Sequence, residues 1–249
     1  MQAAQEYDFP VSLQPLFTKS GKTMPKVQAV VRDDTAEPLS HVSMGYKLVP
    51  HRDVLNAAES FVKTLGEPKR NIYLNKNGAT ITGEYTYADK SVAVGVGDVV
   101  GLRVYVENSY NSSMSLRVRV GALVLRCMNG MMVPRDIYSM TFRHVGAREI
   151  HWPHPEEIIG NFQAEGKKWN TYAKNDLGDK YQEYADKAVQ DQIVVQKALE
   201  APTLGTTVWD LYNQFTHHIT HNESKTASPI GKIARAERVA RWFDGNFGS

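Results

Sequence analysis

VVGLRVYVENSYNSSMSLRVRVGALVLRCMNGMM, the stretch from Val99 to Met132, decides the fold of this chain. Aliphatic residues alternate with polar ones on both sides of a turn at Asn108 to Ser113. Because successive side chains of a strand point to opposite faces, the stretch predicts a hairpin with one apolar and one polar face. We expect the polar face to be exposed, where arginines and a tyrosine suit phosphates and unstacked bases. Its members are Arg103, Tyr105, Arg117 and Arg119.

The composition indicates a globular protein of a reducing compartment. Of the 249 residues, 42% are hydrophobic and 22% are charged. The single cysteine, Cys127, excludes an intramolecular disulfide. No apolar run approaches the roughly 20 residues that span a bilayer, and the first residues lack the basic start of a signal peptide. We therefore expect a cytoplasmic protein with no membrane partner.

The net charge of +2 is the sum of an uneven distribution, in which the middle and the end of the sequence are basic. Residues 101–150 hold seven arginines against three acids, and residues 225–249 hold five basic side chains against two acidic ones. Local charge attracts an anionic partner more than the total does. Further cations of these two segments therefore join the candidate nucleic-acid contacts. They are Arg126, Arg143, Lys232, Arg235 and Arg238.

The first part of the chain predicts a sheet. Residues 1–25 are rich in proline and polar side chains, and we expect an extended arm there. Residues 26–150 predict an antiparallel sheet with one amphipathic helix, His51 to Leu65, which Gly66 would end. An Asn-Gly turn at residues 75–78 is typical of a hairpin. The strands before the quoted hairpin are expected at 26–32, 39–49, 72–74 and 79–87.

Residues 151–249 predict a helical part that packs on the sheet as one unit. Apolar stripes indicate helices at 155–174 and 181–199. Thr207 can cap a third helix with Asp210, and Pro229 begins a fourth. The fold class is thus α+β, with an antiparallel, hairpin-rich sheet first and helices packed on it from the C-terminal part.

Catalytic patterns are weak throughout. His217 and His221 could share one helix face, with His218 beside the apolar stripe. A zinc site needs a further ligand, and a protease motif needs a Glu after the first His. The chain has neither a complete phosphate-binding glycine loop nor a Gly-x-Ser-x-Gly elbow. We predict a protein without catalytic residues, cofactor or metal, and keep a metal enzyme built on the three histidines as an alternative.

Four segments, in order along the chain, carry a family resemblance: AVVRDD (29–34), SMGYKLVPHRDVL (43–55), NSYNSSMSLRVRVGALVLRCMNGM (108–131) and TVWDLYNQFTHHITH (207–221). They resemble the phage/plasmid-like protein family, a conserved domain of unknown function. The most specific matches are the Asn108-Ser109-Tyr110 turn and the segment Cys127, Asn129, Gly130, Met131. Members more often have Asp-Gly where this chain has Asn111-Ser112. The resemblance implies a mobile-element origin, and the family has no established catalytic residues to carry over to this chain.

Phage and plasmid genes of this size often serve replication or recombination. The expected sheet is also similar, at the level of fold, to Rad52-like single-strand annealing proteins. We therefore predict a non-catalytic protein that binds single-stranded DNA as a homo-oligomer and could anneal strands. Arg103, Arg117 and Arg119 would contact phosphates, and Tyr105 would stack on a base. The alternative is a phage module whose basic face binds and modulates a host protein.

Overall fold

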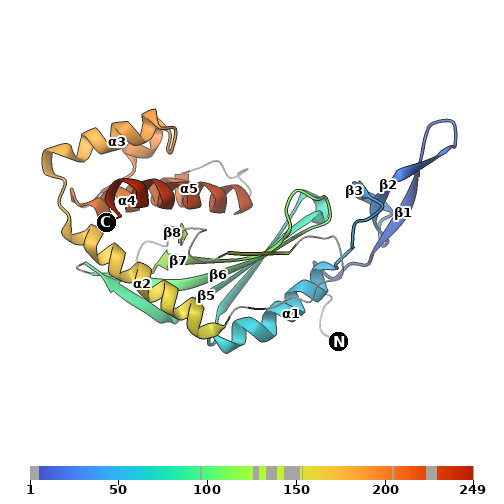
Figure 1. The fold of residues 1–249 in the computed structure, drawn as a ribbon, viewed down its shortest axis with the longest axis horizontal. Coiled ribbons are helices and arrows are strands. Elements are labelled where there is room, and N and C mark those ends of the chain that lie inside the picture. The colour runs from blue at the N-terminus through green and yellow to red at the C-terminus, as the bar shows by residue number, and fades with distance from the viewer. Residues whose placement is uncertain are drawn as a thin grey trace.

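The computed structural model describes residues 6–95, 97–125, 129–132, 139–142, 152, 154–203, 205–222 and 229–248. These residues form a three-stranded and a six-stranded antiparallel sheet, with helices in the C-terminal part (Figure 1). The predicted α+β class is confirmed. A long sheet lies in the middle of the molecule, the small sheet at one end and most helices at the other (Figure 1).

The small sheet consists of β1 (Val11–Phe17), β2 (Thr23–Arg32) and β3 (Glu37–Ser43), in that order. The expectation of an extended arm at residues 1–25 is wrong for this segment, since β1 pairs with β2 along its length. Its alternation explains the pairing: Val11 and Leu13 pack on the core cluster that contains the buried Val30, and the polar residues Ser12 and Gln14 alternate with them.

The large sheet has the order β4-β5-β6-β7-β8, and β9 also pairs with β7. Its strands are β4 (Lys69–Asn75), β5 (Thr80–Val94), β6 (Asp98–Ser109), β7 (Leu116–Val124), β8 (Asn129–Met132) and β9 (Ser139–Phe142). The quoted hairpin is β6–β7, with Val104 opposite Val120 and Tyr105 opposite Arg119. The predicted Asn-Gly turn is confirmed, because Asn77 (φ 55°) and Gly78 (φ 96°) both have left-handed backbone.

The helices are α1 (His51–Thr64), α2 (Pro155–Lys174), α3 (Tyr181–Gln190), α4 (Val208–His217) and α5 (Pro229–Phe247). The Thr207 cap is confirmed: the Asp210 amide donates to Thr207 Oγ1 (3.1 Å), and the Thr207 amide donates to Asp210 Oδ2 (3.0 Å). The single helix expected at 181–199 is wrong, because Gln192 turns the chain at a φ of 57° after α3 ends.

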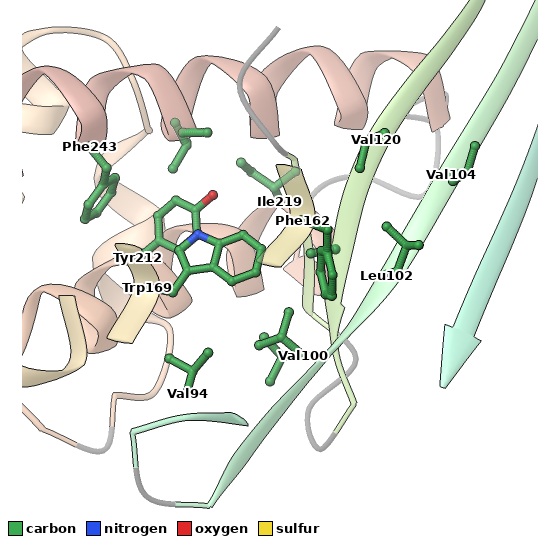
Figure 2. Close-up of a cluster of buried hydrophobic side chains, with 14 of the residues drawn as sticks. Val94, Val100, Leu102, Val104, Val120, Phe162, Trp169, Tyr212, Ile219 and Phe243 are labelled. Atoms are coloured by element: carbon green, nitrogen blue, oxygen red, sulfur yellow. The ribbon is translucent and has the colours of Figure 1, made fainter. Parts of the chain in front are cut away.

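The main core lies between the apolar face of the large sheet and the helices. Helices α1 and α2 pack below the sheet, whereas α5 lies above it and contributes its C-terminal half, from Val239 on, to this core (Figure 1). Figure 2 shows Phe162 and Trp169 of α2 beside Val100 and Leu102 of β6, with Phe243 of α5 close by. Each large apolar side chain buried in this way contributes about 1.5–3 kcal/mol. The alternation predicted for β6 therefore places its even-numbered residues in the core.

The turn after β6 joins the two sheets. The Tyr110 amide donates to Ala79 O of the large sheet at 2.7 Å. Two side chains at the small sheet reach the same turn: Ser40 Oγ donates to Tyr110 O (2.6 Å), and Tyr46 Oη donates to Ser109 O (2.7 Å). Ser109 and Tyr110 are fully buried. The small sheet is thus fastened by hydrogen bonds shielded from water.

His51, at the start of α1, completes this junction. Its amide donates to Tyr110 Oη (2.6 Å), and its ring stacks on the Tyr110 ring with 3.8 Å between centroids. Asn108 Nδ2 donates to His51 Nδ1 and to Val49 O, each at 3.0 Å. The other ring nitrogen, Nε2, lies 2.9 Å from Gly78 O. These partners indicate a neutral imidazole with its proton on Nε2. We call Asn108, Ser109, Tyr110 and His51 the sheet junction.

Replacing Asn108 by alanine should destabilise the fold by on the order of 2–4 kcal/mol, because Val49 O and His51 Nδ1 each lose a buried donor. Urea denaturation followed by circular dichroism measures the free energy of unfolding. Asn56→Ala, at an exposed position of α1, is the control and should change it by less than about 0.5 kcal/mol. Equal losses in the two variants would contradict the role of the junction.

Candidate nucleic-acid interface

The arginine and tyrosine face of β6–β7 is covered. Arg103, Tyr105, Arg117 and Arg119 share one face, as predicted, but Arg103 and Arg119 expose only 8% and 4% of their surface. Tyr105 is also buried, and Arg117 is half-buried. The expectation of an exposed face is therefore wrong. The reason is long-range: α5, far along the chain, packs its N-terminal half on this face (Figure 1).

Arg119 holds α5 to the sheet through two carboxylates. Its Nε lies 2.9 Å from Glu107 Oε2 on β6, and its Nη1 lies 3.0 Å from Glu237 Oε2 on α5. Ile233 and Ala236 of α5 pack beside this pair on Tyr105. Both carboxylates are buried, so each needs this guanidinium as a counter-charge.

Arg103 has a similar environment. Its Nη1 donates to Tyr105 Oη (2.9 Å) and lies 3.5 Å from Glu84 Oε2 on β5. Burial raises the pKa of the Tyr105 phenol, so the hydroxyl stays neutral. The Arg103 guanidinium thus pairs with side chains of its own sheet.

Glu107 is the most enclosed charge of this face. The strand register places it between Thr82 and Arg117. It exposes none of its surface, and burial raises the pKa of its carboxyl despite the opposing effect of Arg119 and Arg117. Together, three carboxylates oppose three guanidiniums here: Glu84, Glu107 and Glu237 against Arg103, Arg117 and Arg119. Among the described side chains of this face, the guanidiniums therefore do not outnumber the carboxylates, and they offer no surplus positive charge to a phosphate backbone.

The other cations predicted to contact nucleic acid differ in their surroundings. Arg126 and Arg143 lie outside the described residues. On α5, Lys232 Nζ donates to Thr220 O at 2.8 Å, and Arg235 is half-buried. Arg238 is exposed.

The three histidines do not gather into one site. The rings of His217 and His221 are 4.7 Å apart between centroids, whereas His218 is buried towards the core. Burial and the neighbouring His221 and His218 lower the pKa of His217. Within the described part of the chain, no three His, Cys, Asp or Glu side chains are arranged to hold a metal ion.

The exposed basic surface is the distal part of the β1–β2 hairpin, residues 14–26. This segment carries Lys19, Lys22 and Lys26, all exposed, and contains no acid. Figure 1 shows it extending away from the rest of the molecule. We call this segment the basic hairpin. Residues 9–32 have four basic side chains and no acid, a signal that could have identified it from the sequence.

Two large apolar side chains accompany these lysines. Phe17, at the end of β1, is 59% exposed, and Met24 of β2 is 41% exposed. The base of the hairpin is held firmly, because the Arg32 guanidinium lies 4.0 Å above the Phe9 ring and Val30 is fully buried. A fixed base thus presents an exposed aromatic ring among cations.

The backbone edges of the small sheet are poorly suited to receive another strand. Its edge strands, β1 and β3, each contain a proline, Pro15 and Pro38. Proline has no N–H group and interrupts the pattern that an added strand needs. The basic hairpin is therefore suited to contacts through its side chains.

Comparison of this chain with protein-family models, with curated proteins and with solved structures gave no match. The resemblance to the phage/plasmid-like family and the likeness to Rad52-like proteins therefore stay predictions. No helix in the described ranges is long and apolar enough to cross a membrane.

Replacing Arg119 by methionine should lower the free energy of unfolding by about 3–5 kcal/mol, because Glu107 and Glu237 would lose their counter-charge. The loss should be larger at pH 8 than at pH 5. Burial raises the pKa of Glu107 and Arg119 opposes that rise, so removal of Arg119 raises the pKa in the folded variant further. The folded variant then binds a proton at pH values where the unfolded carboxyl is still ionised. Falling pH through that window therefore favours the folded variant.

Chemical denaturation at both pH values measures this effect. Arg238→Met, at an exposed position of α5, is the matched control and should cost less than about 0.5 kcal/mol. A loss for Arg119→Met that does not depend on pH would contradict the assignment to buried carboxylates.

Proposed function

We propose that this protein is a non-catalytic single-stranded DNA-binding protein whose contact surface is the basic hairpin. The observation that carries the proposal is the projecting segment 14–26, with its exposed lysines, exposed Phe17 and no acid. In this proposal Arg103, Arg119 and Tyr105 maintain the fold and do not touch DNA.

The hairpin chemistry favours a single strand over a duplex. Lysines attract the phosphate backbone of any nucleic acid and release its counterions on binding. An exposed aromatic ring adds affinity only where bases are unstacked, as in a single strand. Phe17, 59% exposed beside this cationic turn, provides that ring.

The number of contacts favours action as an oligomer. Three lysines and one aromatic ring per chain are few for tight binding of a strand. Several linked copies raise the effective concentration of hairpins along one strand without any new contact. Homo-oligomeric binding, strand annealing in phage or plasmid recombination, and a place in the cytoplasm of the host cell are parts of the same proposal.

Replacing Lys19, Lys22 and Lys26 together by glutamine should weaken binding of a labelled single-stranded oligonucleotide at least roughly tenfold at low salt. The slope of log affinity against log salt should fall by about 2, since each lost phosphate contact removes about 0.7. Fluorescence anisotropy over a salt series measures both quantities.

The matched control makes the same charge change elsewhere, with Lys167, Lys174 and Lys197 replaced by glutamine. All three lysines are exposed in the helical part. The control should keep most of the affinity and the original slope. The proposal fails if the unaltered protein does not bind the oligonucleotide at low salt, or if both triple variants lose affinity equally.

Replacing Phe17 by alanine should weaken single-strand binding by 1–3 kcal/mol, roughly 5- to 150-fold, and leave the salt slope unchanged. Tyr73→Ala, which removes another exposed aromatic side chain, is the control. The same measurement with a duplex of equal length distinguishes single-stranded from double-stranded ligands. If Phe17→Ala weakens duplex and single-strand binding to the same degree, Phe17 does not stack on unpaired bases.

A protein-interaction module that modulates a host protein is the second candidate. Phe17, Met24 and Met44 are all large, apolar and more than one-third exposed in the small sheet and its flank. Such side chains also suit a protein partner with an acidic patch. In nuclease-treated host lysate, a partner that binds the unaltered protein but not the triple lysine variant, together with absent DNA binding, would favour this candidate.

A further inference from the structure

The helical end of the molecule has a pocket of about 350 Å³. It lies between the end of α3, the turn at residues 192–196, the start of the π-helical turn at His218, and α5. Its floor is aliphatic, since Val194 and Ile219 are buried there. At its rim Val195 is 60% exposed, the largest exposed fraction among the large hydrophobic residues described. The pocket therefore combines aliphatic side chains at its floor and rim with polar ones from Gln192, Gln196 and His218.

The charged side chains that line this pocket have one sign. Arg235 and Arg238, three residues apart on α5, both line it. None of the lining residues that the structure describes is an acid. Arg238 is exposed, so its guanidinium is available to a ligand that enters from solvent. A planar guanidinium beside an apolar cavity suits a carboxylate attached to an apolar body.

The volume of the pocket and the residues that line it limit which kinds of ligand can bind there. The volume is near the lower end of the range for ligand pockets, about 300–1,000 Å³, and suits one side chain better than a large cofactor. None of the described lining residues is Phe, Tyr or Trp, and the one aromatic ring among them, His218, is buried, which disfavours stacking of a nucleobase. An apolar side chain with a neighbouring carboxylate satisfies both the floor and the rim.

We propose that this pocket binds a short acidic segment of a protein partner. One aliphatic side chain of the segment rests on Val194 and Ile219, and an adjacent carboxylate pairs with Arg238. The site lies at the opposite end of the molecule from the basic hairpin (Figure 1), so it can be occupied while the hairpin holds a strand. It does not depend on the function proposed for the hairpin.

The test uses the full chain and a C-amidated Asp-Asp-Leu-Leu peptide whose N-terminus carries the fluorophore through an amide bond. Fluorescence anisotropy should show saturable binding, and Asn-Asn-Leu-Leu and Asp-Asp-Ser-Ser peptides should bind at least tenfold more weakly. Arg238→Glu and Val195→Asp should each raise the Kd for the first peptide at least tenfold. Arg241→Glu makes the same charge change at an exposed position of α5 that does not line the pocket, and should raise the Kd less than threefold.

Each contrary outcome overturns the proposal. Absence of saturable binding by the unaltered protein excludes an acidic peptide site of this kind. Equal losses for Arg238→Glu and Arg241→Glu would show attraction to the whole helix without a pocket. Competition by a single-stranded oligonucleotide against the peptide, retained in the triple lysine variant of the hairpin, would assign the pocket to nucleic acid.

Discussion

The buried hydrogen bonds of the sheet junction are the constraint on which the rest of the structure depends. Asn108, Ser109 and Tyr110 end a strand of the large sheet, and they bind the start of α1 and two side chains at the small sheet. Because these groups are shielded from water, each one left unpaired would cost about 1–3 kcal/mol. A network of this kind permits one arrangement of its parts. The direction in which the basic hairpin projects therefore follows from three residues of a turn.

The polar face of the large sheet obeys a similar constraint with charges. Arg119 pairs with Glu107 on the neighbouring strand β6 and with Glu237 on α5. Such buried pairs add little net stability compared with well-packed apolar residues, but removing one member leaves an uncompensated charge. The network therefore specifies which face of α5 meets the sheet. The same ion pairs also balance the positive charge of the arginines, which on an exposed strand would attract a phosphate backbone.

Local patterns were predictable from the sequence, and long-range contacts were not. The apolar stripe of α1, the Asn77-Gly78 turn and the Thr207 cap depend on neighbouring residues, and all three are confirmed. The burial of Arg119 by α5 depends on contacts between residues more than a hundred positions apart in the sequence. The alternation of apolar and polar residues along β7 therefore could not predict it. The pairing of β1 was hidden for another reason: Pro15 resembles loop chemistry, yet proline is tolerated at a sheet edge.

The two proposed binding surfaces would attract anionic ligands through different interactions. The lysines of the basic hairpin are exposed to solvent, where salt screens their charges beyond about 10 Å at 0.1 M ionic strength. The pocket combines Arg238 with an apolar floor at Val194 and Ile219, and burial of apolar surface does not weaken as salt rises. Nucleic acid at one end would thus exchange readily with ionic conditions, while an acidic segment at the other end would be held largely by its apolar side chain. If both proposals hold, the chain would keep a protein partner while it releases and rebinds a strand.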